Sequence, residues 1–327
     1  MMPKPVPHQA GNVHHHKPRK KRRLRTISML PTLLTLGNLY FGFVAISMCG
    51  REMYDLGANV KPDAVQTLNR SFFEKHAPSH LSIAAWMLVA AMLCDALDGR
   101  VARKTGAASK FGEQLDTIAD VVSFGVAPAL IMVTLIYREI TQSGYSPFGF
   151  DRFSQATALI AAVYVCCAAL RLARFTVEAS AEEASHSGFL GMPSPAAAAA
   201  IISLVYLHDH LQTANILPMV AKAILHTLPL CTLAIALLMV SRVPYRHFVS
   251  WFLRRRPFGH IILVLLVLPL LWLFTSQMLA LIAWIFVISG PIGMLRGVGA
   301  HTDLEPSQNS VTDSRENNEP SSHRPIQ

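Results

Sequence analysis

Long runs of apolar residues, separated by short polar segments, set the pattern of this chain. A helix needs about 20 mostly apolar residues to cross the hydrocarbon core of a bilayer. Eight runs are close to this length, and they cover residues 31–49, 82–101, 117–137, 156–175, 193–209, 221–241, 259–275 and 277–295. Only the residues TSQ separate the last two runs, which we interpret as a tight hairpin. The pattern predicts an all-α integral membrane protein with eight spans.

The composition supports this class and adds little chemistry. Of the 327 residues, 52% are hydrophobic and only 15% are charged, which is too apolar for an ordinary soluble domain. Two terminal segments, 1–27 and 299–327, are polar and are predicted to be disordered, and 50–80 is the one long connection. We expect the five cysteines to be small buried residues, because all lie in apolar runs without a C-x-x-C pair.

Positively charged residues are concentrated in every second connection between the apolar runs. A basic segment precedes the first run, and further arginines and lysines follow the second, fourth and sixth runs. Threading eight spans from a cytoplasmic N-terminus places these basic segments on the cytoplasmic side, as the positive-inside rule requires. The net charge of +9 is explained by this pattern and by attraction to anionic lipid headgroups, so no nucleic-acid partner is expected.

Four aspartates stand where two predicted spans meet the cytoplasm, in the stretch DALDGRVARKTGAASKFGEQLDTIAD. Asp95 and Asp98 are three residues apart, and Asp116 and Asp120 are four apart, so each pair shares one face of a helix. A turn between the two helices would bring both faces together. Acids placed beside hydrocarbon are costly and usually functional.

Divalent cations would explain why the acids are tolerated. Like charges this close oppose one another's ionisation, and oxygen ligands without histidine or cysteine favour Mg²⁺, Mn²⁺ or Ca²⁺. Small residues at Gly99, Ala102 and Gly112 would let a nucleotide approach the backbone, and Arg103 could bind a phosphate through two hydrogen bonds. The alternative is that acids and bases simply neutralise one another at a helix end.

The spacing of these residues resembles the signature of the CDP-alcohol phosphatidyltransferase family. That signature reads D-x-x-D-G-x-x-A-R, eight residues, then G-x-x-x-D-x-x-x-D, and this chain matches every fixed position. The resemblance implies a six-helix core over about residues 28–250, with the last two helices (251–298) outside it. It also implies that two divalent ions, Mg²⁺ or Mn²⁺, bind the diphosphate of a CDP-linked lipid and that a hydroxyl displaces CMP.

Residue roles follow from the same resemblance. The implied metal ligands are Asp95, Asp98, Asp116 and Asp120, and Asp120 is also the implied base for the acceptor hydroxyl. The implied CDP-lipid-binding residues are Gly99, Ala102, Arg103 and Gly112. Family members commonly pair, so a homodimer is expected on this ground alone.

Other segments resemble the membrane-integrated phosphatidylserine synthases within this family. The resemblance is carried mainly by ADVVSFGVAPA, which overlaps the second aspartate pair, and by LRLARF. It implies CDP-diacylglycerol as donor and L-serine as acceptor. The alternatives are glycerol 3-phosphate or inositol phosphate as acceptor and, outside the family, a cation-binding membrane transporter. A transporter leaves the glycines and Arg103 unexplained.

Two arginines and two polar residues of the first span have competing interpretations. Arg171 and Arg174 are three residues apart and can share one face. They would either hold the acceptor or a phosphate, or anchor the span end at the interface. Thr35 and Asn38 would hydrogen-bond either the nucleotide or neighbouring helices.

Overall fold

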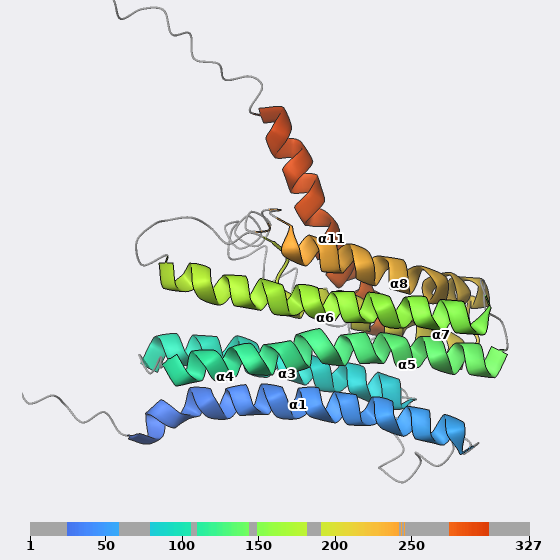
Figure 1. The fold of residues 1–327 in the computed structure, drawn as a ribbon, viewed down its shortest axis with the longest axis horizontal. Coiled ribbons are helices and arrows are strands. Elements are labelled where there is room, and N and C mark those ends of the chain that lie inside the picture. The colour runs from blue at the N-terminus through green and yellow to red at the C-terminus, as the bar shows by residue number, and fades with distance from the viewer. Residues whose placement is uncertain are drawn as a thin grey trace, which may run out of the picture.

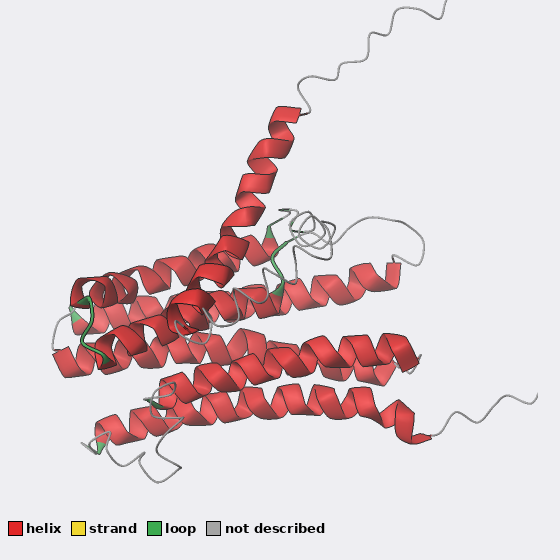
Figure 2. Ribbon diagram, turned by 180° about the vertical axis from the view of Figure 1, so that it is seen from behind, coloured by secondary structure: helices red, strands yellow, loops and turns green. Residues whose placement is uncertain are grey.

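The computed structural model describes residues 25–58, 79–105, 110–143, 149–181, 191–241, 243, 245 and 275–300. These residues form helices α1 (Arg25–Gly57), α3 (His80–Thr105), α4 (Lys110–Asp120), η2 (Val121–Val126), α5 (Ala127–Ser143), α6 (Phe150–Ala181), α7 (Ser194–Thr213), α8 (Pro218–Val240) and α11 (Thr275–Ala300). All of them except α11 run roughly side by side in one bundle, and the C-terminal part of α11 projects away from it (Figures 1 and 2).

Six of the described helices are long and apolar enough to cross a membrane, which confirms the all-helical multi-pass class. They cover 30–57, 80–102, 111–143, 152–177, 218–240 and 275–294. The predicted span 193–209 coincides with α7, whose last turns carry His208, Asp209 and His210 and make it less apolar. The eighth predicted span, 277–295, coincides with α11. Residues 259–274 lie outside the described part, as do 1–24, 59–78 and 301–327, so the seventh predicted span and both tails stay predictions.

Several helices extend beyond the spans that the hydrophobic pattern predicts. Helix α1 continues to Gly57, so the first residues of the segment interpreted as a 50–80 loop are helical. Helices α4, η2 and α5 follow one another without a break and continue to Ser143, six residues past the predicted end of the third span. The extensions carry charged residues that are buried against one another, and hydropathy cannot anticipate such a pairing.

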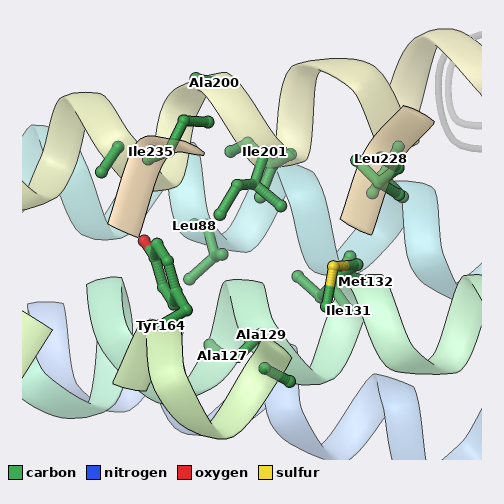
Figure 3. Close-up of a cluster of buried hydrophobic side chains, with 14 of the residues drawn as sticks. Leu88, Ala127, Ala129, Ile131, Met132, Tyr164, Ala200, Ile201, Leu228 and Ile235 are labelled. Atoms are coloured by element: carbon green, nitrogen blue, oxygen red, sulfur yellow. The ribbon is translucent and has the colours of Figure 1, made fainter. Parts of the chain in front are cut away.

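The core is assembled from apolar side chains of α3, α5, α6, α7 and α8. Figure 3 shows Leu88, Ile131, Met132, Ile201 and Leu228 among the labelled side chains that gather between the helices. All five are fully buried, and α5 contributes most densely, because residues on nearly every side of it are buried. This central helix fixes the η2 and α4 segments that precede it.

Small residues bring α1 close to the helices that carry the aspartates. A Cβ atom at Gly42 would lie 2.2 Å from Oγ of Ser123 on η2, and one at Gly37 would lie 3.3 Å from Sγ of Cys94 on α3. Packing of this kind is typical of membrane helices, where small residues allow close backbone approach. Helix α1 is therefore positioned to reach the acidic residues with short side chains.

A buried polar network joins four helices at the start of α3, the end opposite the aspartates. Arg138 of α5 donates to Asp209 of α7 at 2.9 Å and to Glu52 of α1 at 3.3 Å, and it also pairs with its neighbour Glu139 at 3.2 Å. Ser79 and Ser82, at the start of α3, donate to the same Asp209. Arg138 and Glu139 directly follow the third predicted span, which ends at residue 137, and the structure buries both of them inside the bundle.

Candidate metal and nucleotide site

Three of the four aspartates meet between the last turns of α3 and the helix α4. One carboxylate oxygen from each of Asp95, Asp98 and Asp116 lies within 4.8 Å of the other two. The spacing of three residues on α3 places its two acids on one face, and α4, which packs against α1, brings Asp116 to them. The predicted convergence of the two acidic faces is confirmed for these three residues.

The donor set fits a divalent cation. Asp98 is 6% exposed, and Oδ1 of Asp116 is buried with no hydrogen-bond partner in the part of the chain that the structure describes. A buried carboxylate oxygen without a partner is costly unless a positive charge compensates it. Three such oxygen donors, with no nitrogen or sulfur ligand in the group, suit hard ions such as Mg²⁺ or Mn²⁺.

Asp120 lies apart from this group of three. It follows Asp116 by one turn of helix, about 6 Å along the axis, and its Oδ1 accepts a hydrogen bond from Nδ2 of Asn38 at 3.0 Å. Its charge still interacts with those of Asp95 and Asp116. The sequence predicts four aspartates in one cluster, whereas the structure gives a group of three with a neighbour held by an amide.

Helix α1 supplies the partners of two aspartates. Oγ1 of Thr35 donates to Oδ2 of Asp98 at 3.1 Å, and Asn38 holds Asp120 as described above. Both α1 side chains are buried. Of the two interpretations of Thr35 and Asn38, the hydrogen bond to a neighbouring helix is the one present here. The acceptors are the carboxylates of Asp98 and Asp120, and the sequence analysis did not predict these two contacts.

A π-helical turn follows Asp120 directly. In η2 the N–H of Ala127 donates to the carbonyl of Val122, five residues earlier. The hydroxyl of the fully buried Tyr164 donates to the carbonyl of Phe124 at 2.9 Å and so satisfies a backbone group inside the irregular turn. Single π-turns are frequent at functional sites, and this one sets how α4 presents its acids above α5.

One arginine brings positive charge to the site. Nη1 of Arg171 on α6 donates to Oγ of Ser194 at the start of α7, and its charge interacts with those of Asp120 and Asp95. Its buried Nε has no hydrogen-bond partner among the described residues. Arg174 lies one turn further along α6 and is half-buried. The structure therefore brings Arg171, the first of the two candidate arginines, toward the aspartates.

The small residues of the motif lie on the same two helix ends. A Cβ atom added at Gly99 would meet nothing within 4 Å, so protein packing does not require glycine there. Ala102 is half-buried on the last turns of α3, and Gly112 is half-buried on the first turn of α4. The side chain of Arg103 lies outside the described part of the chain. Open space beside Gly99 is what an approaching ligand would need.

This fold and site define an integral membrane protein with a carboxylate cluster at one end of its helix bundle. Comparison with protein-family models then places the chain more closely. The model of the CDP-alcohol phosphatidyltransferase family matches residues 28–232. The chain belongs to that family.

Curated relatives carry more specific names. A CDP-diacylglycerol–serine O-phosphatidyltransferase from Helicobacter pylori is 35% identical over 217 residues, which are 65% of this chain and 80% of that enzyme. An enzyme of the same name from Methanocaldococcus jannaschii is 35% identical over 160 residues, 49% of this chain and 61% of its own. An archaetidylserine synthase from Methanothermobacter thermautotrophicus is 33% identical over 169 residues, 50% of this chain and 58% of its own.

Proposed function

We propose that the protein transfers the phosphatidyl group of CDP-diacylglycerol to the hydroxyl of L-serine. The new bond joins the serine oxygen to the lipid phosphorus, the bond between that phosphorus and the CMP oxygen breaks, and phosphatidylserine and CMP leave. The observation that carries the proposal is the group of three carboxylates formed by the family's signature aspartates. The names of the relatives support serine as the acceptor.

In this proposal Asp95, Asp98 and Asp116 would hold the divalent ions that bind the diphosphate. Bound Mg²⁺ or Mn²⁺ would polarise the phosphoryl oxygens and neutralise charge on the departing CMP. The protein's part is to keep three oxygen donors within 4.8 Å and to fix Asp98 with the hydroxyl of Thr35. The buried Oδ1 of Asp116, which has no hydrogen-bond partner among the described residues, supports its assignment as a ligand.

Asp120 is the proposed base for the serine hydroxyl. Its separation from the group of three and its hydrogen bond to Asn38 favour this role, because a base must be held toward the proton that it accepts. Arg171 lies close enough for its charge to act on Asp120. We propose that its guanidinium orients the carboxylate of serine, with Arg174 as a second, outer contact.

The donor nucleotide is proposed to lie along the end of α3. Open space beside Gly99 supports a close approach of the ligand to the backbone, and Ala102, Arg103 and Gly112 complete the proposed surface. Arg100 and Lys104, both exposed on the same helix end, support a cytoplasmic location for the site. We propose that both termini lie on the same side. A homodimer stays an expectation from the family.

An acceptor panel tests the proposed function. We expect purified protein with CDP-diacylglycerol and Mn²⁺ to release CMP when L-serine is added. Glycerol 3-phosphate and inositol phosphate should release at least about 100-fold less, because a site built for a carboxylate and amine leaves a phosphate poorly paired. Radiolabelled serine should appear in the lipid product. Release of CMP with glycerol 3-phosphate but not with serine would reject serine as the acceptor.

Removal of divalent ions gives a second expected result. EDTA should lower CMP release at least about 100-fold, since metal stabilisation of a phosphoryl transfer is worth several kcal/mol. Excess Mg²⁺ or Mn²⁺ should restore it. Mg²⁺ should also raise the apparent unfolding temperature of the protein without substrate, because it binds only the folded state. EDTA saturated with Mg²⁺ beforehand is the control, and full activity in free EDTA would refute the metal assignment.

A further inference from the structure

The short segment 191–193, which leads into α7, is fixed by the end of α8. Gly191 has a φ of +94°, a conformation that favours glycine, and its N–H donates to the carbonyl of Val243 at 3.0 Å. A Cβ atom there would lie 2.6 Å from the carbonyl oxygen of Met239. The N–H of Met192 donates to the carbonyl of Leu238 at 3.3 Å. The last carbonyls of a helix have no partner within it, so the end of α8 can hold this segment in one position.

The fixed segment presents a buried hydroxyl to α6. Ser194, the first residue of α7, is fully buried. A serine at a helix start commonly caps the helix with its side chain, but the N-cap residue here is Pro193 and no side-chain cap is formed. Oγ of Ser194 instead accepts a hydrogen bond from Nη1 of Arg171. The hydroxyl therefore serves the arginine and not the helix.

Helix α6 places Arg171 beside the aspartates. Tyr164, Ala168 and Arg171 follow one another at intervals of four and three residues, so they lie on one face of α6. The hydroxyl of Tyr164 donates to a carbonyl of η2, and the Cβ atom of Ala168 would lie 3.4 Å from a Cβ atom at Gly125. This face packs against η2, and the charge of Arg171 interacts with that of Asp120.

Arg171 is held near the acids without being paired to one of them. Among the described residues, the salt bridges involve Arg138 and His80, and none joins Arg171 to a carboxylate. Its buried Nε has no hydrogen-bond partner in the same part of the chain. A buried N–H without a partner is costly, so a ligand oxygen that reached this nitrogen would be bound favourably.

We propose that Ser194 is a positioning residue for the acceptor: it holds Nη1 of Arg171, keeps the guanidinium off the aspartates and directs its other N–H groups to the carboxylate of the acceptor amino acid. The inference rests on the proposed function, in which the acceptor hydroxyl lies at Asp120. A guanidinium binds a carboxylate best when its planar fork is already oriented. Without the hydroxyl of Ser194, Coulomb attraction would draw the arginine to the aspartates.

The variant Ser194→Ala tests this role. With donor and Mn²⁺ saturating, we expect the KM for L-serine to rise about tenfold, the usual effect of losing a hydrogen bond to a charged group. The kcat and the KM for the donor should change less than about threefold, because the lost interaction contributes to acceptor binding. Ser203→Ala is the matched control: it makes the same change at a buried serine of the same helix, whose hydroxyl donates to the carbonyl of Ala200.

A double-mutant cycle shows whether Ser194 acts through Arg171. In the Arg171→Gln background, adding Ser194→Ala should lower kcat/KM for serine less than about twofold, because the two residues share one interaction. A further loss of about tenfold in that background would show independent effects and would overturn the positioning role. An unchanged KM for serine in Ser194→Ala, or a rise in the KM for the donor instead, would also overturn it.

If Ser194→Ala does not fold, Ser194→Cys takes its place. Cysteine keeps nearly the same size, but its sulfur is a weak hydrogen-bond acceptor, so the KM for serine should again rise, by about fivefold or more. A KM equal to that of the unaltered protein would reject the role of Ser194. Absence of CMP release with serine by the unaltered protein would instead reject the proposed function, so the two failures are distinguishable.

Discussion

Replacement of Asp116 by asparagine is expected to lower CMP release by about 10³-fold or more while the protein stays folded. Asparagine keeps the size of the side chain but offers a neutral oxygen, so the three-carboxylate group loses one of its charges. Metal stabilisation of the leaving group is worth several kcal/mol, and each 1.36 kcal/mol is tenfold in rate. The loss should appear in kcat, measured at saturating donor, serine and Mn²⁺.

Two further readings distinguish loss of a ligand from damage to the fold. Without metal, Asp116→Asn should unfold at the same or a higher temperature than the original protein, because removing one of several neighbouring carboxylates relieves repulsion. Added Mg²⁺ should raise that temperature much less than in the original. Glu113→Gln, an exposed acid on the same helix, is the control and should keep its activity. Activity of Asp116→Asn within tenfold of the original would remove Asp116 from the metal site.

The acidic pairs show what a local pattern can predict. Asp95 and Asp98 lie on one face because of helical period alone, and a short connection between two helices is enough to bring Asp116 to them. Long apolar runs likewise predicted the helices of the bundle, since hydropathy and length decide whether a helix can span. The helical spacing of the aspartates and the hydropathy of a run both depend only on residues that are close together in the sequence.

The partners of those acids depend on packing that no local pattern contains. Thr35 is 63 residues from Asp98, and Asn38 is 82 residues from Asp120. Their contacts require Gly37 and Gly42 to bring α1 against α3 and η2. The position of Asp120 also depends on the π-turn after it, which is held by the hydroxyl of Tyr164. One signal was available: polar residues inside an otherwise apolar span usually bond to another helix.

The buried network around Arg138 was missed for a related reason. Charged residues at the end of an apolar run are normally interpreted as the beginning of a loop, because an isolated charge is expelled from hydrocarbon. Here Arg138 is 6% exposed and Glu139 is 6% exposed, within a helix that continues to Ser143. The acids that compensate the arginine come from α1 and α7, so only the assembled bundle shows that burial is permitted.

Replacement of Arg138 by methionine is therefore expected to be the most destabilising single change outside the catalytic end. Methionine fills similar volume but leaves Glu52, Glu139 and Asp209 buried without their shared cation. Breaking a buried ion pair from one side typically costs about 3–5 kcal/mol. The apparent unfolding temperature in detergent should fall by several degrees or more. Arg152→Met, at an exposed arginine on α6, should leave it unchanged.

The same variant separates stability from catalysis. The network lies at the start of α3, whereas Asp95 lies 15 residues later on that helix, about 22 Å along its axis. At low temperature, where the variant is still folded, kcat for serine should stay within about threefold of the original because no group at the aspartates changes. Asp209→Asn should be less damaging, since Arg138 keeps Glu52 and Glu139. A variant Arg138→Met as stable as the original would show that the network is dispensable; a variant stable but inactive would show that this end of the bundle is coupled to the site.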